Sequence, residues 1–215
     1  MTQLALDLLQ PLRPTLDNYV PGRNAEAVAA LRMLLAWRLV ERIVYLWGDA
    51  GCGRSHLLTA LVEAGAVRWT PQADATAPGI TVVDDVQTLD AAAQIALFNR
   101  LNEVRARPNA ACVVAGDTAP AALPLREDLR SRLAWGYVYR LHVLTDEQKA
   151  AALAAHAAGR GLRYDPEVIP FLLTHLPRDM RTLIAALNAL DAYALARKRV
   201  LSIALVREWL AGSGP

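Results

Sequence analysis

The sequence predicts an α/β protein in which a parallel five-stranded sheet forms a base and a small all-helical lid follows it. Short apolar segments rich in β-forming residues alternate with helix-compatible segments as far as residue 144, and only helical patterns occur beyond that point. A glycine-rich loop directly after the first apolar segment indicates a strand–loop–helix unit. We therefore divide the chain into a flexible tail (1–15), an α/β base domain (16–144) and a helical lid domain (145–215).

Five apolar segments are the expected strands of the base: 43–47, 67–70, 80–83, 112–115 and 137–141. Apolar residues at helical spacing predict helices over 25–39 and 91–107, and the alternation favours parallel strands joined by crossovers. The connection 71–79 is an exception, because it is shorter than the dozen or so residues that a parallel crossover usually needs. Either this connection is unusually tight or the second strand is irregular.

Local start signals predict four helices in the lid. Thr145 and Gln148 have the spacing of a capping box, which satisfies the first backbone N–H groups of a helix. The Asp-Pro pair at 165–166 predicts a cap and a first-turn proline on the second helix. Pro177 is expected to open the third helix and Ser202 the fourth.

Residues 48–55 read Gly-Asp-Ala-Gly-Cys-Gly-Arg-Ser, the pattern of a phosphate-binding loop with arginine in place of the usual lysine. The glycines allow backbone N–H groups to surround a phosphate, and the next helix directs its positive end at the anion. The Ser55 hydroxyl would reach Mg²⁺. Because Arg54 is planar and bulkier than lysine, we expect a loop that binds nucleotide well and turns it over poorly, as in a sensor. The alternative is a glycine-rich turn without a ligand.

Carboxylates follow two of the predicted strands. Asp84 and Asp85 end the strand 80–83, where phosphate-loop enzymes hold Mg²⁺ and polarise a water molecule. We expect Asp84 to face the metal and Asp85 to orient the water, and a solvated turn is the alternative. Asp117 follows the strand 112–115 and is a candidate sensor of a γ-phosphate, with a strand-end turn as its alternative.

Four arginines lie near the ends of predicted elements. Arg130 and Arg132 precede the last strand, and Arg178 and Arg181 fall in the expected first turn of a lid helix. An arginine at a helix N-terminus opposes the helix dipole. We therefore expect an anionic partner for Arg181, and the alternative is a solvated surface charge.

Composition excludes several classes of protein. With 54% hydrophobic and 20% charged residues the chain is globular, and no apolar run approaches the roughly 18 residues of a membrane helix. No secretory signal is visible, and two cysteines, one of them in the phosphate loop, indicate a reducing cytoplasm. The four histidines lack metal-ligand spacing, and a net charge of +2 is too small to indicate nucleic-acid binding by itself.

The order of these motifs resembles one family. After the phosphate loop come Val-Val-Asp-Asp, Ala-Gly-Asp, Leu-Arg-Ser-Arg-Leu-Ala-Trp-Gly and Arg-Asp-Met-Arg-Thr-Leu, similar to the AAA+ module of the replication initiator DnaA and, more closely, to DnaA-related regulators of the Hda type. The resemblance covers about residues 16–210 and is most specific at 53–58. It implies that Arg132 is an arginine finger and that ADP or ATP with Mg²⁺ is bound by Val20, Pro21, Gly51, Cys52, Gly53, Arg54, Ser55, His56 and the lid arginine Arg181.

Two departures from the initiator pattern are visible. The chain stops at Pro215, directly after the lid, where the initiator continues into a DNA-binding domain. The connection 71–79 is also too short for a segment that grips single-stranded DNA, so we expect no strong direct DNA binding. The acidic pair Asp84 and Asp85 is retained, which leaves open some intrinsic ATP hydrolysis.

The tail resembles a short motif of the same regulators. Residues 3–8 read Gln-Leu-Ala-Leu-Asp-Leu, similar to the hexapeptide with which Hda-type regulators and polymerases hold the sliding clamp. Gln3, Leu4, Leu6 and Leu8 would make this contact. Leu6 and Leu8 would fill an apolar pocket while Gln3 forms a hydrogen bond at its rim.

The leading hypothesis is a regulatory adaptor that holds ADP, docks on the DNA-loaded clamp and presents Arg132 to ATP on the initiator DnaA. The stimulated hydrolysis would prevent re-initiation. One alternative is a stand-alone AAA+ ATPase of the helicase-loader type, against which Arg54 and the short connection 71–79 count. Two others are a small-molecule kinase, for which no acceptor-site motif is found, and a clamp-binding scaffold independent of nucleotide. No membrane partner is expected, and self-association is left open.

Overall fold

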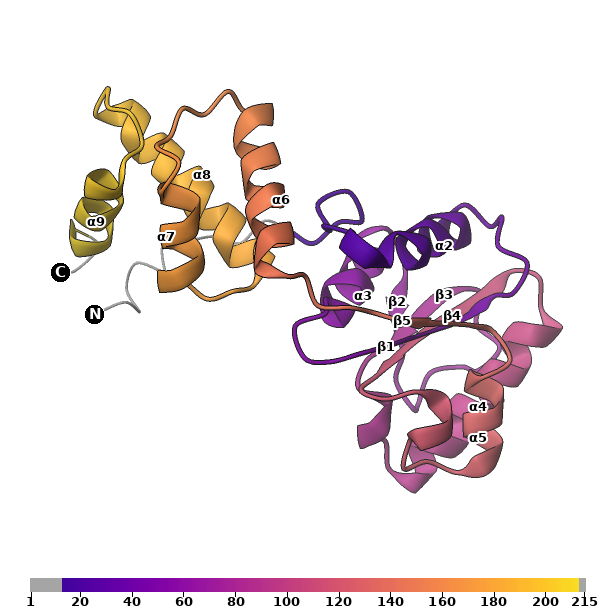
Figure 1. Ribbon diagram of the computed structural model, residues 1–215. Coiled ribbons are helices and arrows are strands. Elements are labelled where there is room, and N and C mark those ends of the chain that lie inside the picture. The colour runs from indigo at the N-terminus through magenta and orange to yellow at the C-terminus, as the bar shows by residue number, and fades with distance from the viewer. Residues whose placement is uncertain (1–12, 213–215) are drawn as a thin grey trace. The chain divides into compact units, whose positions relative to one another are not determined.

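The computed structural model describes residues 13–212. The chain forms two compact units, one from Pro14 to Val143 and one that begins at Leu144. The first unit has a sheet covered by helices, and the second is built from helices (Figure 1). The predicted α/β fold with its five-stranded parallel sheet is confirmed.

The strands are parallel and lie in the order β2-β3-β4-β1-β5. β4 (Ala110–Gly116) is central and fully buried, and its neighbour β1 (Ile43–Trp47) is nearly so. Parallel strands covered on both faces form continuous apolar runs, which explains why these two strands show no polar alternation. β3 (Gly79–Val83) lies on the other side of β4, and the outermost strands are β2 (Val67–Arg68) and β5 (Tyr137–Arg140).

Helices cover both faces of the sheet (Figure 1). α2 (Ala25–Leu35) and α3 (Arg54–Glu63) pack on one face, and α4 (Ala91–Ala106) and α5 (Glu127–Leu133) pack on the other. Successive side chains of a strand point to opposite faces. The same apolar strands therefore supply both hydrophobic cores of the unit.

Three elements differ from the sequence-based expectation. α2 ends at Leu35 rather than at residue 39, because the chain turns back through Trp37, which has a left-handed conformation (φ 55°). The second strand covers only Val67–Arg68, so it is shorter and more irregular than the expected 67–70. α5 has no counterpart among the expected elements. Its acidic first turn and basic last turn suit the helix dipole.

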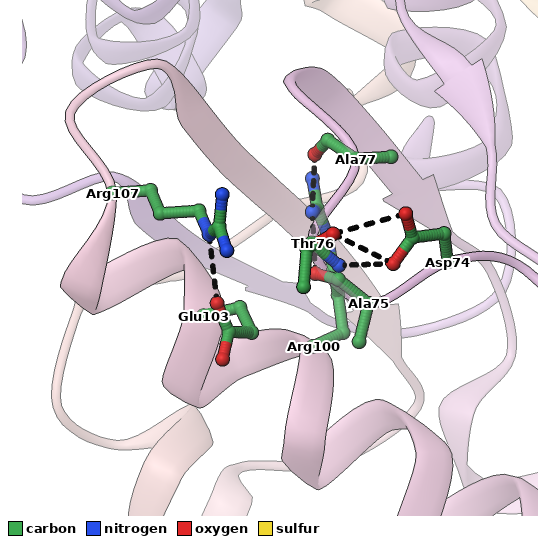
Figure 2. Close-up of polar contacts among 7 residues, drawn as sticks. All are labelled: Asp74, Ala75, Thr76, Ala77, Arg100, Glu103 and Arg107. Carbon is green, nitrogen blue, oxygen red and sulfur yellow. Dashed lines mark hydrogen bonds and ion pairs between the residues drawn. The ribbon is translucent and has the colours of Figure 1, made fainter.

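The connection between β2 and β3 is organised by Arg100 of α4, which is 1% exposed (Figure 2). Its Nη1 donates to the carbonyl oxygens of Ala75 (2.9 Å) and Ala77 (2.6 Å). Its Nη2 donates to the Gly79 carbonyl and its Nε to the Thr81 hydroxyl, both at 3.3 Å. One buried guanidinium thus donates hydrogen bonds to three backbone carbonyls. These bonds allow a short connection without a helix to join two parallel strands.

The second unit contains α6 (Asp146–Gly159), α7 (Val168–His175), α8 (Met180–Ala196) and α9 (Ile203–Gly212). Their apolar faces form one core. Within the described residues this unit has a single isolated bridge, at Tyr164, and no strand. Among the helices that the structure describes, none is both long and apolar enough to cross a membrane.

Two of the predicted helix starts are confirmed. Thr145 and Gln148 form the capping box of α6, with the Thr145 hydroxyl accepting from the Gln148 N–H at 3.2 Å and the Gln148 amide oxygen accepting from the Thr145 N–H at 3.0 Å. Ser202 directly precedes α9, and its hydroxyl accepts a long hydrogen bond of 3.4 Å from the Leu205 N–H. Caps act within a few residues, so they are readable from sequence.

The other two predicted starts are displaced. The Asp-Pro pair at 165–166 lies in the turn before α7 and not in the helix itself. Pro177 likewise precedes α8, and the helix is capped by Asp179, whose carboxylate accepts from the Thr182 N–H at 2.9 Å. Arg178 therefore lies outside the helix rather than in its first turn, whereas Arg181 is inside it.

Candidate functional site

The phosphate loop occupies the turn between β1 and α3. Gly51 and Gly53 have left-handed backbone conformations, with φ of 82° and 96°. Gly53 directly precedes α3, and a Cβ on it would lie 2.6 Å from Cε2 of Tyr19. Glycine is therefore required here both for its conformation and for the close approach of the Tyr19 ring. The first N–H groups of α3 are available to an anion at this end of the helix.

The segment before α2 packs against the loop through Tyr19. The Tyr19 hydroxyl donates to the Cys52 carbonyl at 3.0 Å and accepts from the Asn24 side-chain amide at 2.9 Å. Burial raises the pKa of Tyr19 to about 12, so this hydroxyl keeps its proton near neutral pH. The His56 ring lies 5.4 Å from the Tyr19 ring, between centroids. Val20, half-buried, and Pro21, exposed, continue the same segment.

Asn24 connects this segment to the chain that follows β5. Its amide nitrogen donates to the His142 carbonyl at 2.9 Å, and its amide oxygen accepts from the His142 N–H at 2.7 Å. Sequence reasoning missed both Asn24 and the role of Tyr19. The one available signal was that Tyr19 directly precedes Val20 and Pro21, which the resemblance assigns to nucleotide binding. Burial also raises the pKa of the Cys52 thiol, which disfavours a thiolate in the loop.

Arg54 links the loop to the end of β4. Its half-buried guanidinium donates through Nη1 to the carbonyl of Gly116, the last residue of β4. The Tyr45 hydroxyl donates to the Thr118 carbonyl at 2.7 Å, and a Cβ on Gly116 would lie 2.2 Å from that hydroxyl oxygen. Burial is the main reason that the pKa of Tyr45 is raised, and the negative charge of Asp117 raises it further.

The predicted acidic residues lie at the same edge of the sheet as the loop, namely the edge where the parallel strands end. Asp84 and Asp85 follow β3, Asp117 follows β4, and β3, β4 and β1 are consecutive parallel strands. Asp85 has a left-handed conformation (φ 47°), and its N–H donates to the Asp84 carboxylate at 3.0 Å. The Asp85 carboxylate accepts from the Gln87 amide at 3.1 Å.

The donor set suits Mg²⁺ held jointly with a phosphate. Ser55 and Asp84 offer oxygen ligands, and Mg²⁺ usually combines one or two protein oxygens with water and phosphate oxygens. Among the residues that the structure describes, no cluster of three or more His, Cys, Asp or Glu side chains could hold a metal alone. Such a site would therefore depend on the nucleotide for part of its coordination.

Arg132 lies toward the opposite edge of the sheet, where β1 and β5 begin. It belongs to the last turn of α5, and β5 then begins at Tyr137, which pairs with Val44 at the start of β1. The phosphate loop follows the other end of β1, about 13 Å further along the strand at 3.3 Å per residue. The structure therefore does not bring Arg132 together with the loop, Asp84 and Asp117.

Arg130 and Arg181, two further residues singled out from the sequence, lie on elements other than those that form the phosphate-loop site. Arg130 donates from Nη1 to the Ala121 carbonyl at 3.0 Å, within its own unit. Arg181 lies exposed in the helical unit, and no side chain of residues 13–212 forms an ion pair or hydrogen bond with its guanidinium. The anionic partner expected for Arg181 is thus not a described protein group. Gln3, Leu4, Leu6 and Leu8 lie outside the described residues.

A phosphate loop after β1, carboxylates after β3 and β4, and a following helical unit define a P-loop protein of the AAA+ class. Residues 146–210 match the family "Hda, lid domain". The chain is also 34% identical to an uncharacterized protein of Haemophilus influenzae over 227 aligned positions, which cover 97% of this chain and 98% of that protein. The chain belongs to the Hda-type, DnaA-related AAA+ proteins.

Solved structures share the same fold. Domain III of the replication initiation protein DnaA from Thermotoga maritima is 20% identical, with a TM-score of 0.65 over 95% of this chain and 98% of that one. The replication initiator DnaA bound to AMPPCP and single-stranded DNA is 21% identical, with a TM-score of 0.67 over 89% of this chain and 69% of that one. At this identity the likeness establishes the fold.

Proposed function

We propose that this chain is a nucleotide-dependent regulatory adaptor of the replication initiator DnaA. In this proposal it holds ADP with Mg²⁺ and docks through its N-terminal hexapeptide on the DNA-loaded sliding clamp. It then offers Arg132 to ATP that the initiator binds, and hydrolysis of that ATP prevents re-initiation in the cytoplasm. Two observations support this function: membership of the Hda-type family, and the position of Arg132 at the end of β1 that lies opposite the phosphate loop.

Nucleotide binding is supported by the edge that carries the phosphate loop. The loop and the start of α3 supply backbone donors, and Arg54 adds a positive charge beside the Gly116 carbonyl. Ser55 and Asp84 would hold Mg²⁺, which supplies charge neutralisation at the phosphates when bound. The related DnaA fold has been solved with AMPPCP, so this architecture is compatible with a nucleotide.

The observation that carries the adaptor proposal is the separation of Arg132 from its own phosphate loop. Arg132 lies near the start of β1, and its own phosphate loop follows the end of β1. In this proposal its target is therefore a nucleotide on another molecule. Exposed apolar side chains lie beside its neighbour Trp135: Val40 is 81% exposed, and Val40 and Trp135 line a cavity of about 130 Å³ together with charged residues that include Arg105. Apolar groups of this kind suit a protein interface.

The main rival is a stand-alone ATPase. Asp84 and Asp85 support it, whereas Arg54 opposes it, because a guanidinium bonded to Gly116 is poorly placed to follow a transferring phosphoryl group. The functions separate in a turnover assay with ATP-loaded initiator and DNA-loaded clamp. We expect little hydrolysis by the protein alone and rapid decay of initiator-bound ATP in the full mixture. If the protein alone hydrolysed ATP as fast as the full mixture does, the stand-alone ATPase would be established.

Arg54→Ala is expected to abolish nucleotide binding. The wild-type melting temperature should rise with millimolar ADP and Mg²⁺, by mass action, and the variant should show no rise because its backbone donors lack a side-chain counterion. Arg54→Lys is the control, since it keeps the charge and should keep the shift. A normal shift in Arg54→Ala, or none in the wild type, would contradict the assignment of this site.

The tail is expected to bind the clamp independently of the folded units. Changing Gln3, Leu6 and Leu8 together to alanine should reduce clamp binding to background in a surface-binding assay, because the pocket loses its apolar anchors and its rim hydrogen bond. The melting temperature should stay nearly unchanged. If clamp affinity survives the triple change, the hexapeptide is not the docking element.

A further inference from the structure

The guanidinium of Arg132 is held by side chains from two elements. Its Nε donates to the Asn102 side-chain oxygen on α4 at 2.7 Å. Its central carbon lies 3.4 Å from the centroid of the Trp135 ring, in the turn after α5, and 5.1 Å from the Phe98 ring on α4. One hydrogen bond fixes the inner edge of the group, and the indole fixes its plane.

The outer edge of the same guanidinium is left open. Arginine has five N–H donors, and only the one on Nε has an acceptor among the described residues. Arg100 is the contrast within this chain, because its Nη1 donates to carbonyl oxygens of the connection before β3 and its Nε and Nη2 donate to oxygens of β3 itself. Arg100 is fully committed to its own unit, whereas Arg132 is oriented and keeps four donors for an anion.

The surroundings of Trp135 add a second positive charge. The guanidinium of Arg105 lies 4.4 Å from the centroid of the same ring. Neither Arg105 nor Arg132 forms an ion pair with any carboxylate in residues 13–212. Glu41 lines the same small cavity as Arg105 and Trp135 without forming an ion pair with either arginine. Two cations on one indole, neither of them ion-paired within the described residues, favour an anion such as a phosphate.

Trp135 is itself held in place by the backbone. Its N–H donates to the Arg132 carbonyl at 3.2 Å. The next residue is Gly136, where a Cβ would lie 2.0 Å from the Ile43 carbonyl oxygen, so the chain passes directly against the residue that opens β1. The backbone that carries the indole is therefore fixed against the base, so the ring starts from a defined position beside its neighbour Arg132.

We propose that Asn102 and Trp135 are positioning residues that pre-orient Arg132 toward the phosphates of ATP on the partner initiator. This inference rests on the proposed function and adds the residues on which the finger depends. A finger that is already oriented loses little conformational freedom when it meets the transition state. Its partners should therefore influence the maximal rate of hydrolysis and leave the affinity between the proteins largely unchanged.

The test measures decay of initiator-bound ATP on a DNA-loaded clamp, over a range of concentrations of the full-length protein. For Trp135→Leu and Asn102→Ala we expect the maximal rate to fall about tenfold each, with the half-saturating concentration unchanged within about twofold. Trp135→Phe should retain most of the rate because it keeps an aromatic face. Glu103→Ala is the control, since its side chain on α4 accepts a hydrogen bond from Arg107 and, within residues 13–212, forms none with Arg132 or Trp135.

A double-mutant comparison ties the effect to Arg132. Adding Trp135→Leu or Asn102→Ala to Arg132→Ala should cause no further loss, because the positioned group is already gone. Full maximal rates for both Trp135→Leu and Asn102→Ala would overturn the positioning role while Arg132→Ala still abolishes stimulation and the proposed function stands. Full stimulation by Arg132→Ala would instead overturn the proposed function. If Trp135→Leu fails to fold, Asn102→Ala alone decides.

Discussion

Arg132→Ala is expected to lower the stimulated hydrolysis of initiator-bound ATP by about 10³-fold or more. An arginine finger stabilises charge that develops only in the transition state, and in GTPases this effect amounts to about 10³–10⁵ in rate. The ADP-induced rise in melting temperature and the affinity for the clamp should both persist. The measurement is the decay of initiator-bound ATP on a DNA-loaded clamp, with the wild type and the variant compared at saturating concentration.

Arg130→Ala is the matched control for this prediction. Arg130 lies in the same short helix as Arg132, but its Nη1 donates to the Ala121 carbonyl of its own unit. We therefore expect at most a small fall in stimulation. Wild-type stimulation by Arg132→Ala, or an equally large loss in Arg130→Ala, would refute the assignment of the finger and most of the proposed function.

Arg100→Met is expected to destabilise the base by about 3 kcal/mol. Methionine fills a similar volume but cannot donate, so the carbonyls of Ala75, Ala77 and Gly79 lose their hydrogen-bond donor. Each buried polar group left unpaired costs about 1–3 kcal/mol, and part of this cost is relieved if the connection opens to water. Urea unfolding of the full-length chain, followed through the transition of the base, measures the change in free energy of unfolding.

Arg107→Met is the control for Arg100. Its side chain forms an exposed ion pair with Glu103 at 2.8 Å, a few residues along the same part of the chain (Figure 2). Exposed pairs of this kind contribute about 0–1 kcal/mol. A loss in Arg100→Met as small as that in Arg107→Met would mean that Arg100 does not hold the connection together.

Much of the fold and of the loop site was readable from residues that act locally. Gly51 and Gly53 adopt the left-handed conformations that only glycine takes easily, and Thr145 and Gln148 cap α6 as predicted. Carboxylates after parallel strands meet at one edge of the sheet, so Asp84 and Asp117 lie beside the loop. The errors included the end of α2, the length of the second strand, the unexpected helix α5 and two helix starts near prolines, where Asp179, and not Pro177, caps α8.

The sequence by itself determined the class of protein and the chemistry of the loop, because glycines, caps and apolar periods act over a few residues. Only the tertiary structure decided which distant side chains support that chemistry. Asn24 bonds to His142 across 118 positions, and Arg132 bonds to Asn102 across 30. Arginine illustrates the reason. Arg100 is buried and donates hydrogen bonds to several protein oxygens, whereas Arg132 uses one of its N–H donors within the described residues. Only the acceptors that folding brings near distinguish the two arginines.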